Sequence, residues 1–414
     1  MTVAAAAARV ADLWPAARVV GDQLAIRGVL MRGGTSRGAF LRSEDLPPDP
    51  AARDRAILAI YGSPDARQID GLGGAEPLTS KVAIVGPSTR PGADVDYLFG
   101  QVRIAEPIVD YRGNCGNMLA GIGPFAIDEG LVPATDPLTR VRIHQVNTRT
   151  LVIAEVPTQG GRALTSGTAT TPGVPGTGAA IKLDFAASAD TLGRGLLPTG
   201  HAEDELTDQA GNSYRVSLVD AGNPTVFLRA TDLGLDPQRL VASSYPPALL
   251  ERLEALRGAA GERLGLVASR SRSAAESPTV PKIYLVHPPA EYVTSRGTRV
   301  PASAVDLVAR GLVTQQLHAA YAATVAVATA TATRLPGTIP AQVATQHSPG
   351  MVRIGHPGGV LTLEVAVELG TSGEARLTRA VIERTARRVM AGEMYVPMHV
   401  LSGDRSRETQ GRNV

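Results

Sequence analysis

Two candidate helices, over residues 117–129 and 314–334, carry small or apolar side chains on nearly every face. A helix that is apolar all round has to be buried all round, so each of them needs a shell of other elements. Short β-rich segments that alternate with polar residues surround both helices in the sequence, as half-buried antiparallel strands do. Because one such helix lies in each half of the chain, we expect an α+β fold. It would have two similar domains, each a curled, mostly antiparallel sheet around a central helix.

The expected boundaries follow from this division. Residues 26–205 form the N-terminal domain and residues 206–395 the C-terminal domain, with a polar, glycine-containing linker over residues 198–212. Residues 396–414 are expected to be a tail. Residues 1–25 are an Ala-rich N-terminal extension without the basic start of a signal peptide.

Other elements are predicted from local signals. The expected strands include residues 82–85, 141–143, 150–156, 215–219, 282–286 and 361–367. A helix over residues 49–61 has Asp49 as its N-cap, Pro50 at its first position and Gly62 as its C-cap. Amphipathic patterns predict further helices over residues 247–257 and 377–390, the second of them basic and closed by Gly392.

Charge and composition exclude several kinds of partner. The formal net charge is +2 and no block of like charges occurs, which argues against nucleic-acid binding and against a polybasic membrane patch. The seven histidines show no metal-ligand spacing, so we expect no metal site. Cys115 is the only cysteine, so no disulfide can form within the chain and a reducing, cytoplasmic location is expected. A racemase mechanism with one thiol on each face of the substrate is excluded for the same reason.

Lysine is rare in this chain. Only three of the 41 Lys and Arg residues are lysines, namely Lys81, Lys182 and Lys282. Lysine differs from arginine chiefly in that it can lose its proton when desolvated. Lys81 enters an apolar strand after a glycine-rich loop, where a buried amine could act as a base. The alternative is a strand-edge lysine in a salt bridge, and for Lys182 and Lys282 we favour that structural role.

Cys115 lies in a loop of small and polar residues, 112–118, just before the first apolar helix. Glycines on both sides of Asn114 and Cys115 allow close approach of the backbone to a ligand. The start of the helix would offer free N–H groups and positive potential, which favour both a carboxylate and a thiolate. The alternative is an inert, buried cysteine.

Three further loops have the character of anion sites. Residues 31–38 combine arginines, hydroxyls and glycines that could grip a carboxylate. Residues 70–74 are glycine-rich and lead to the Lys81 strand, and His356 lies in a glycine-rich turn over residues 355–359. The alternative for each is a plain turn, and it carries more weight for residues 70–74 and for His356 than for residues 31–38. The Gly-x-Ser-x-Gly pattern at residues 34–38 does not indicate a hydrolase, since no helix can follow the serine directly.

Several of these segments resemble the 2-methylaconitate isomerase family, which includes 4-oxalomesaconate tautomerase. The matching segments are residues 31–38, 68–74, 78–85, 94–99 and 113–118, with shorter matches at 173–177, 197–200, 281–282, 335–338 and 356–357. The resemblance implies a diaminopimelate-epimerase-like fold with the active site in the cleft between the domains. It also implies that Lys81 and Cys115 are the catalytic pair. True epimerases carry a second cysteine, which this chain lacks.

The resulting hypothesis is a cofactor-free isomerase that moves a proton, and with it a double bond, within a small unsaturated tricarboxylic acid. The segments look most like 4-oxalomesaconate tautomerase; 2-methylaconitate or aconitate isomerase is the alternative, and a non-catalytic carboxylate-binding protein a more remote one. A homodimer is compatible with this hypothesis. The residues expected to hold the substrate are Arg32, Gly34, Thr35, Ser36, Gly73, Ser80, Asn114, Gly116, Asn117 and His356.

Overall fold

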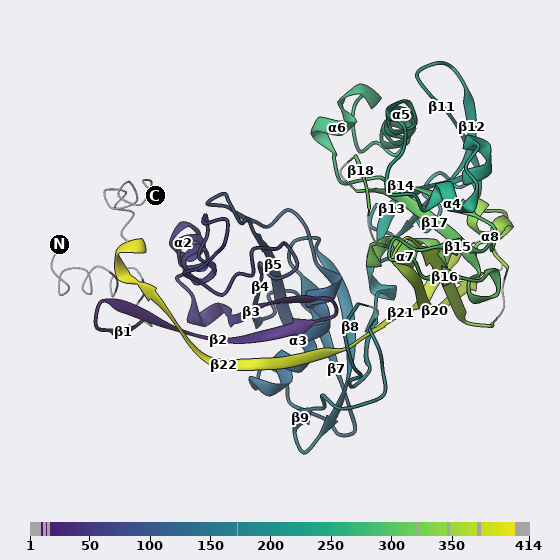
Figure 1. The fold of residues 1–414 in the computed structure, drawn as a ribbon. Helices are drawn as coiled ribbons and strands as arrows, with labels where there is room; N and C mark the ends of the chain where they lie inside the picture. The colour runs from purple at the N-terminus through teal and green to yellow at the C-terminus, as the bar shows by residue number, and fades with distance from the viewer. Residues whose placement is uncertain are drawn as a thin grey trace. The chain divides into compact units, whose positions relative to one another are not determined.

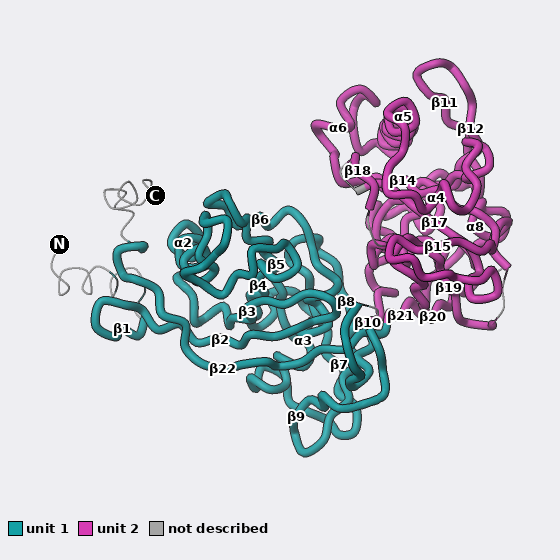
Figure 2. Tube along the Cα trace, in the orientation of Figure 1, with its two compact units in different colours: residues 1–182, 383–414 teal, residues 183–382 magenta. Residues whose placement is uncertain are grey.

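The computed structural model describes residues 10, 14 and 17–401, with gaps at residues 172, 314, 319–320, 346–347 and 371–373. The chain forms two compact units, shown in Figure 2. Unit 1 comprises residues 1–182 and 383–414, and unit 2 comprises residues 183–382. The chain therefore passes between the units twice, within β10 (Ile181–Asp184) and within β21 (Ala375–Arg384).

This division differs from the expected boundary after residue 205. The expected linker lies inside unit 2, where β11 (Asp204–Thr207) pairs with β12 (Ser213–Ala221). The last strand, β22 (Ala386–Pro397), returns to unit 1 because it pairs with β2 (Gln23–Gly33) along the whole length of β2, as Figure 1 shows. A pairing between such distant segments leaves no local signal in the sequence.

Unit 1 is built from consecutive strands wrapped around one helix. Its other strands are β1 (Arg18–Val20), β3 (Ser36–Arg42), β4 (Lys81–Pro87), β5 (Val95–Val102), β6 (Val109–Asp110), β7 (Leu138–Gln145), β8 (Thr150–Gln159) and β9 (Arg162–Ala163). Most neighbours are antiparallel, while β3 with β4 and β5 with β7 are parallel. The expected strands at residues 82–85, 141–143 and 150–156 are confirmed.

The central helix of unit 1 is α3 (Gly116–Asp128), and its residues 118–127 are all buried. Glycines let the strands approach this helix closely. A Cβ at Gly121 would lie 2.6 Å from the ring of Phe40, and one at Gly123 would lie 2.6 Å from Val156. The prediction of a helix buried on every face is confirmed.

A second helix, α2 (Pro50–Tyr61), covers the opposite face of β3 and β4. Asp49 caps it by accepting a hydrogen bond from the backbone N–H of Ala52 at 2.7 Å, and Gly62 ends it in the left-handed conformation. The predicted bounds and caps are therefore confirmed. The core beneath α2 also contains Val10, Trp14, Val396, Met398 and Leu401. Segments on both sides of the expected domain boundaries, at residue 25 and at residue 396, thus contribute to this core.

Unit 2 repeats the arrangement. Its remaining strands are β13 (Asn223–Arg229), β14 (Lys282–His287), β15 (Tyr292–Val293), β16 (Arg299–Val300), β17 (Leu307–Val313), β18 (Gln316–Leu317), β19 (Met351–His356) and β20 (Gly359–Leu369). Its helices are α4 (Pro237–Leu240), α5 (Pro247–Arg263), α6 (Ser273–Glu276), α7 (Ala323–Ala332) and α8 (Ile339–Val343). The expected strands at residues 215–219, 282–286 and 361–367 are confirmed, and α5 extends the expected helix at residues 247–257.

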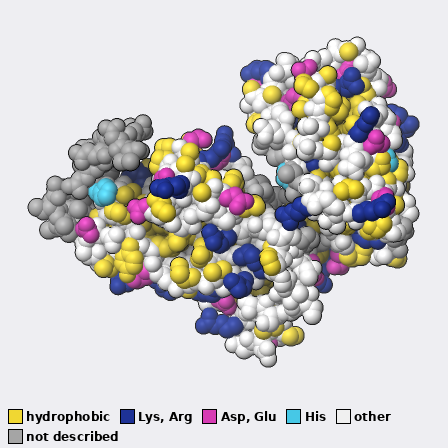
Figure 3. Space-filling view, viewed as in Figure 1, with side chains coloured by type: hydrophobic (Ala, Val, Ile, Leu, Met, Phe, Trp, Pro, Cys, Tyr) yellow, Lys and Arg dark blue, Asp and Glu magenta, His cyan; other side chains and the backbone are white. Residues whose placement is uncertain are grey.

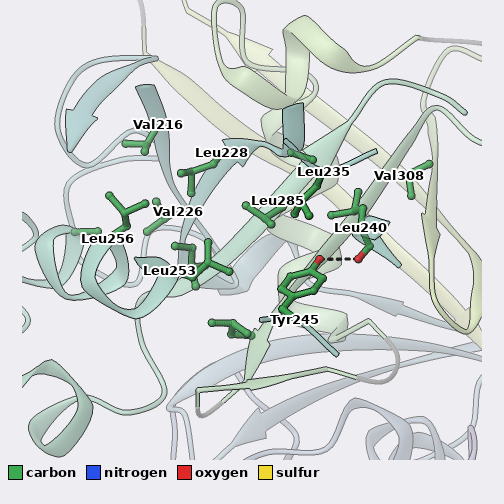
Figure 4. Close-up of a cluster of buried hydrophobic side chains, with 14 of the residues drawn as sticks. Val216, Val226, Leu228, Leu235, Leu240, Tyr245, Leu253, Leu256, Leu285 and Val308 are labelled. Atoms are coloured by element: carbon green, nitrogen blue, oxygen red, sulfur yellow. Dashed lines mark hydrogen bonds between the residues drawn. The ribbon is translucent and has the colours of Figure 1, made fainter. Parts of the chain in front are cut away.

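The two faces of the unit 2 sheet are covered by different helices. On one face α5 packs on a buried apolar cluster, drawn in Figure 4, that includes Val226, Leu253, Leu256 and Leu285. The helix α7 is buried from Val325 to Ala332 and packs against β12, β13 and β20. It corresponds to α3 of unit 1, so each unit has one central, buried helix.

Two predicted helices are wrong in part or in whole. The helix expected over residues 314–334 begins only at Ala323, because β17 runs to Val313 and turns back into β18, with Leu312 opposite Leu317. Residues 314 and 319–320 of that prediction lie outside the described part. No helix forms over residues 377–390, where a basic helix was expected, because this segment belongs to the strands β21 and β22. Gly392, the expected end of that helix, lies within β22 and pairs with Gly28.

Candidate active site

Three buried polar side chains meet at one point in unit 1. The Lys81 ammonium nitrogen lies 3.3 Å from the Cys115 sulfur and 3.1 Å from the Ser36 hydroxyl oxygen. The Ser36 oxygen lies 4.0 Å from the same sulfur. Ser36 is 1 % exposed, and Lys81 and Cys115 are each 8 % exposed. An amine, a thiol and a hydroxyl are thus in mutual contact, shielded from bulk water, in an arrangement whose chemistry allows protons to pass between them.

The elements of unit 1 explain why these side chains converge. Lys81 opens β4, Ser36 opens β3 and Cys115 is the N-cap of α3. Gly38 lies opposite Lys81 in the parallel pairing of β3 and β4, and a Cβ at Gly38 would come within 1.7 Å of the Lys81 carbonyl oxygen. The start of β4 therefore requires a glycine at this place in β3.

The electrostatic setting favours an anionic guest. The Lys81 ammonium makes no ion pair among the residues that the structure describes, and its nitrogen lies 5.9 Å from the centre of the Phe99 ring. The salt-bridge alternative for Lys81 thus finds no partner in the described chain. Burial, followed by the neighbouring Cys115, raises the pKa of Tyr97 well above its ordinary value, so this phenol stays neutral beside the thiol.

The loop between β2 and β3 is clasped to the start of α3. The side-chain amide of Asn117 donates to the Thr35 hydroxyl at 2.9 Å. Gly34 has a φ of +50°, and a Cβ there would lie 2.3 Å from the Asn117 side-chain oxygen. Gly116 is the first residue of α3, so the expected binding residues Gly34, Thr35, Gly116 and Asn117 do come together beside Cys115.

Arg32 was expected to bind a substrate carboxylate through its guanidinium, but in the structure this guanidinium is hydrogen-bonded to the backbone. Its guanidinium donates to the carbonyl oxygens of Gly34 and Thr385, each at 2.8 Å. Burial and the nearby Arg387 lower the pKa of Arg32. The side chain therefore ties the β2–β3 turn to Thr385, between β21 and β22, and lends positive charge to the turn.

Asn114 also lies near the site, where its side-chain amide is 3.4 Å from the Gln145 side-chain oxygen. Gln145 is 1 % exposed and donates to Thr150. Gln145 could not be predicted as a neighbour of the site, because its contact with Asn114 spans 31 residues and no local pattern reports it.

The glycine-rich loop after α2 is organised by Gln68. The Gln68 side-chain oxygen accepts hydrogen bonds from the Ala75 backbone and from the Ser80 hydroxyl, the second at 2.7 Å. A Cβ at Gly73 would overlap this side chain. Ser80 and Gly73, both expected to bind substrate, thus contact Gln68. The structure gives them a part in shaping the loop, and their contact with substrate stays a prediction. Gln68 itself was missed.

His356 belongs to unit 2, where its ring accepts a hydrogen bond from the Gly358 backbone N–H at 3.1 Å. Its own backbone N–H donates to the Tyr292 hydroxyl at 2.9 Å. These contacts are those of a well-ordered turn, and its role toward a substrate stays a prediction.

A cavity of about 260 Å³ lies at the other end of α3, between Phe125, Glu129 and the strands β2 and β22. It does not include Lys81 or Cys115. Two of its lining cations are already paired, since Arg388 contacts Glu129 at 2.6 Å and Arg42 contacts Glu44, which lies outside the lining, at 2.6 Å. The Lys81–Cys115 pair is therefore the candidate site, because no carboxylate pairs with its amine in the described part of the chain.

Within the described residues, no three His, Cys, Asp or Glu side chains gather as a metal site requires. No described helix is both long and apolar enough to cross a membrane. On the face drawn in Figure 3, basic side chains are interspersed with acidic and apolar ones over both units.

Comparison with known proteins places the chain in a family. The PrpF protein family matches residues 23–397. The chain is 45% identical to 3-methylitaconate isomerase of Eubacterium barkeri over 91% of its own length and 98% of that protein. It is 41% identical to (4E)-oxalomesaconate Delta-isomerase of Novosphingobium sp., over 88% of this chain and 96% of that protein.

A 2-methyl-aconitate isomerase of Shewanella oneidensis is 39% identical over 91% of this chain and 98% of that protein. A crystal structure of methylitaconate-delta-isomerase, 45% identical, superposes with a TM-score of 0.83 and covers 92% of this chain and 97% of that one. The predicted α+β, diaminopimelate-epimerase-like fold is thereby confirmed. The chain belongs to the PrpF protein family and is an isomerase.

Proposed function

We propose that this isomerase transfers an allylic proton within a small unsaturated polycarboxylic acid, with Lys81 and Cys115 as its acid and base. The observation that carries the proposal is the 3.3 Å contact between the Lys81 nitrogen and the Cys115 sulfur in a buried site. An amine and a thiol so close can each hold the proton that the other lacks, and neither is tied up by a carboxylate among the described residues.

The chemistry needs a place for negative charge. Removing a proton next to a carboxylate creates a dienolate, and fixed donors that meet this charge usually supply the largest part of catalysis. The free N–H groups at the start of α3 and the Lys81 ammonium supply such donors. Thr35 and Asn117 would then hold a second carboxylate, since both line the same corner of unit 1.

The position of the two groups also bears on the stereochemistry. Because Lys81 and Cys115 touch each other, both approach a bound acid from the same side. The proton would therefore leave one carbon and return two carbons away on the same face of the molecule. Such a path needs no second thiol, in accord with a chain that has only Cys115.

The identity of the acid is a finer question. The names of the relatives cover 3-methylitaconate, 2-methyl-aconitate and oxalomesaconate, at 45%, 39% and 41% identity. The matching segments suggested oxalomesaconate as the substrate, but the sequence identities do not favour oxalomesaconate over the other two acids. Methylitaconate is a dicarboxylate, so we extend the proposed class from tricarboxylic to di- and tricarboxylic acids with one double bond.

The test is a panel of these three acids, followed by ultraviolet absorbance of the conjugated product and by uptake of deuterium from heavy water. With the best acid, Lys81→Met, Lys81→Arg and Cys115→Ser should each lose at least about 100-fold in turnover. Lys81→Arg is the decisive variant, because it keeps the charge and loses the titration. Lys182→Met is the control and should keep its activity. Near-normal turnover of Lys81→Arg would contradict the proposed proton transfer by Lys81.

A further inference from the structure

Unit 2 repeats the framework that holds Lys81 in unit 1. There β13 and β14 run parallel with Thr225 opposite Lys282, just as β3 and β4 run parallel with Gly38 opposite Lys81. In both units the lysine is the first residue of its strand. Lys282 therefore occupies, in unit 2, the place that Lys81 occupies in the candidate active site.

The neighbouring helix repeats as well. Ala322 is the N-cap of α7, as Cys115 is the N-cap of α3. The start of β13 is clasped to this helix by a hydrogen bond from the Asn223 amide to the Thr324 hydroxyl at 2.5 Å. The equivalent clasp in unit 1 joins Asn117 to Thr35. Unit 2 thus keeps the amine and the clasp but has a methyl group where unit 1 has the thiol.

The direction of the Lys282 side chain follows from strand alternation. Its neighbour Ile283 belongs to the apolar cluster beneath α5, whereas Tyr284 contacts Tyr321, which comes just before α7. Successive side chains of a strand point to opposite faces, so Lys282 lies on the face of Tyr284. That is the face of the central helix, as it is for Lys81.

The Lys282 amine is desolvated and has no counter-ion among the described residues. Burial first, and then the neighbouring Arg257, lower the pKa of Lys282 to about 8. Arg257 itself is paired with Glu254 at 2.6 Å, so that carboxylate is already engaged. Lys282 is partly buried. A partly desolvated cation without a partner is disfavoured, and a bound anion would lower that cost.

We propose that Lys282 is the anchor of a second carboxylate-binding position, built on the unit 2 copy of the active-site framework. The ligand is a carboxylate of a small organic acid. Lacking a thiol, this position binds and does not transfer protons. The carboxylate could belong to the substrate or to a separate effector acid, and both sources share the chemistry that Lys282 recognises. The proposal rests on the proposed function only for the class of acid.

The scarcity of lysine makes a direct test practicable. Protein labelled with ¹⁵N at the lysine side chains should give three resonances, one each for Lys81, Lys182 and Lys282, assigned with the Lys→Met variants. The probe is propane-1,2,3-tricarboxylate, a saturated acid that cannot isomerise. Its addition should shift the Lys282 resonance and raise its titration midpoint, while the Lys182 resonance stays in place.

The outcomes separate this inference from the proposed function. A response of Lys81 alone would overturn the second position and leave the isomerase proposal standing. A response of Lys282 alone would support the second position and count against Lys81 as the substrate amine. If the Lys81 and Lys282 resonances both reach their full shift at one equivalent of acid, the carboxylate at Lys282 belongs to the substrate. If two equivalents are needed, it belongs to a separate effector acid. Sodium sulfate is the matched control, and an equal Lys282 shift with sulfate would overturn carboxylate recognition.

Discussion

Ser36 stands out at the residue scale because its hydroxyl contacts both members of the proposed catalytic pair, Lys81 and Cys115. It lies 3.1 Å from the Lys81 nitrogen, so it fixes where the ammonium points. We predict that Ser36→Ala lowers kcat by about 10- to 100-fold, the worth of a hydrogen bond to a charged group, with little change in KM. Ser217→Ala is the matched control, since Ser217 is equally buried but lies in unit 2. Equal kcat for Ser36→Ala and wild type would contradict the positioning role.

Lys282 allows a residue-scale prediction for stability. Its pKa is about 8 in the folded chain and about 10.4 in an unfolded one, so the unfolded state binds more protons between these values. The stability contributed by Lys282 should therefore rise as pH increases from 8 to 10.4. Below pH 8 the partly buried charge costs about 3 kcal/mol at most.

We accordingly expect Lys282→Met to be more stable than wild type at pH 7, with an advantage that shrinks toward pH 10. Urea unfolding at a series of pH values measures this difference, and Lys182→Met serves as the control. A difference that does not vary with pH would show that Lys282 is not desolvated as described.

The same scale shows what the sequence could reveal of the site. Lys81 and Cys115 could be predicted because each is a rare residue in an informative local context. Gln68 and Gln145 could not, since both lie in ordinary polar surroundings and act through contacts with distant segments. The backbone of Gln68 has a positive φ of 49°, and nothing in the local sequence indicates this conformation at a glutamine.

At the scale of elements, prediction succeeded where the signal is local. The caps of α2 are a side chain and a glycine directly next to the helix in the sequence, so both of its ends could be predicted. The segment at residues 377–390 failed because its spacing imitates an amphipathic helix. Its strand state comes from partners far away in the chain, such as Gly33, which pairs with Ala386.

The β2–β3 turn allows a test of how an element positions the site. Gly34→Ala should destabilise the protein by about 1–3 kcal/mol, because it adds both a strained positive φ and a clash with Asn117. Gly160→Ala is a matched control with a φ of +62° and no atom within 4 Å, so it reports the strain alone. Equal losses for the two variants in urea unfolding would show that the contact with Asn117 does not matter.

At the scale of the whole molecule, the chain builds one framework twice and gives the two copies different chemistry. Unit 1 has an amine and a thiol, while unit 2 has an amine and a methyl group at the corresponding places. The two buried helices in the sequence were enough to predict this repetition. The exact division was not, because β22 closes unit 1 from the far end of the chain.

That closure makes a final prediction about the autonomy of unit 1. Without residues 383–414, β2 loses its partner β22, and the core under α2 loses Val396, Met398 and Leu401. Residues 1–182 alone should therefore unfold at a lower urea concentration than residues 1–182 joined to residues 383–414 by a short Gly/Ser linker. The joined form differs by residues 383–414 and the linker, so any gain in its unfolding midpoint measures the returning segment as a whole. If both forms unfold at the same urea concentration, then β22 is not a structural part of unit 1.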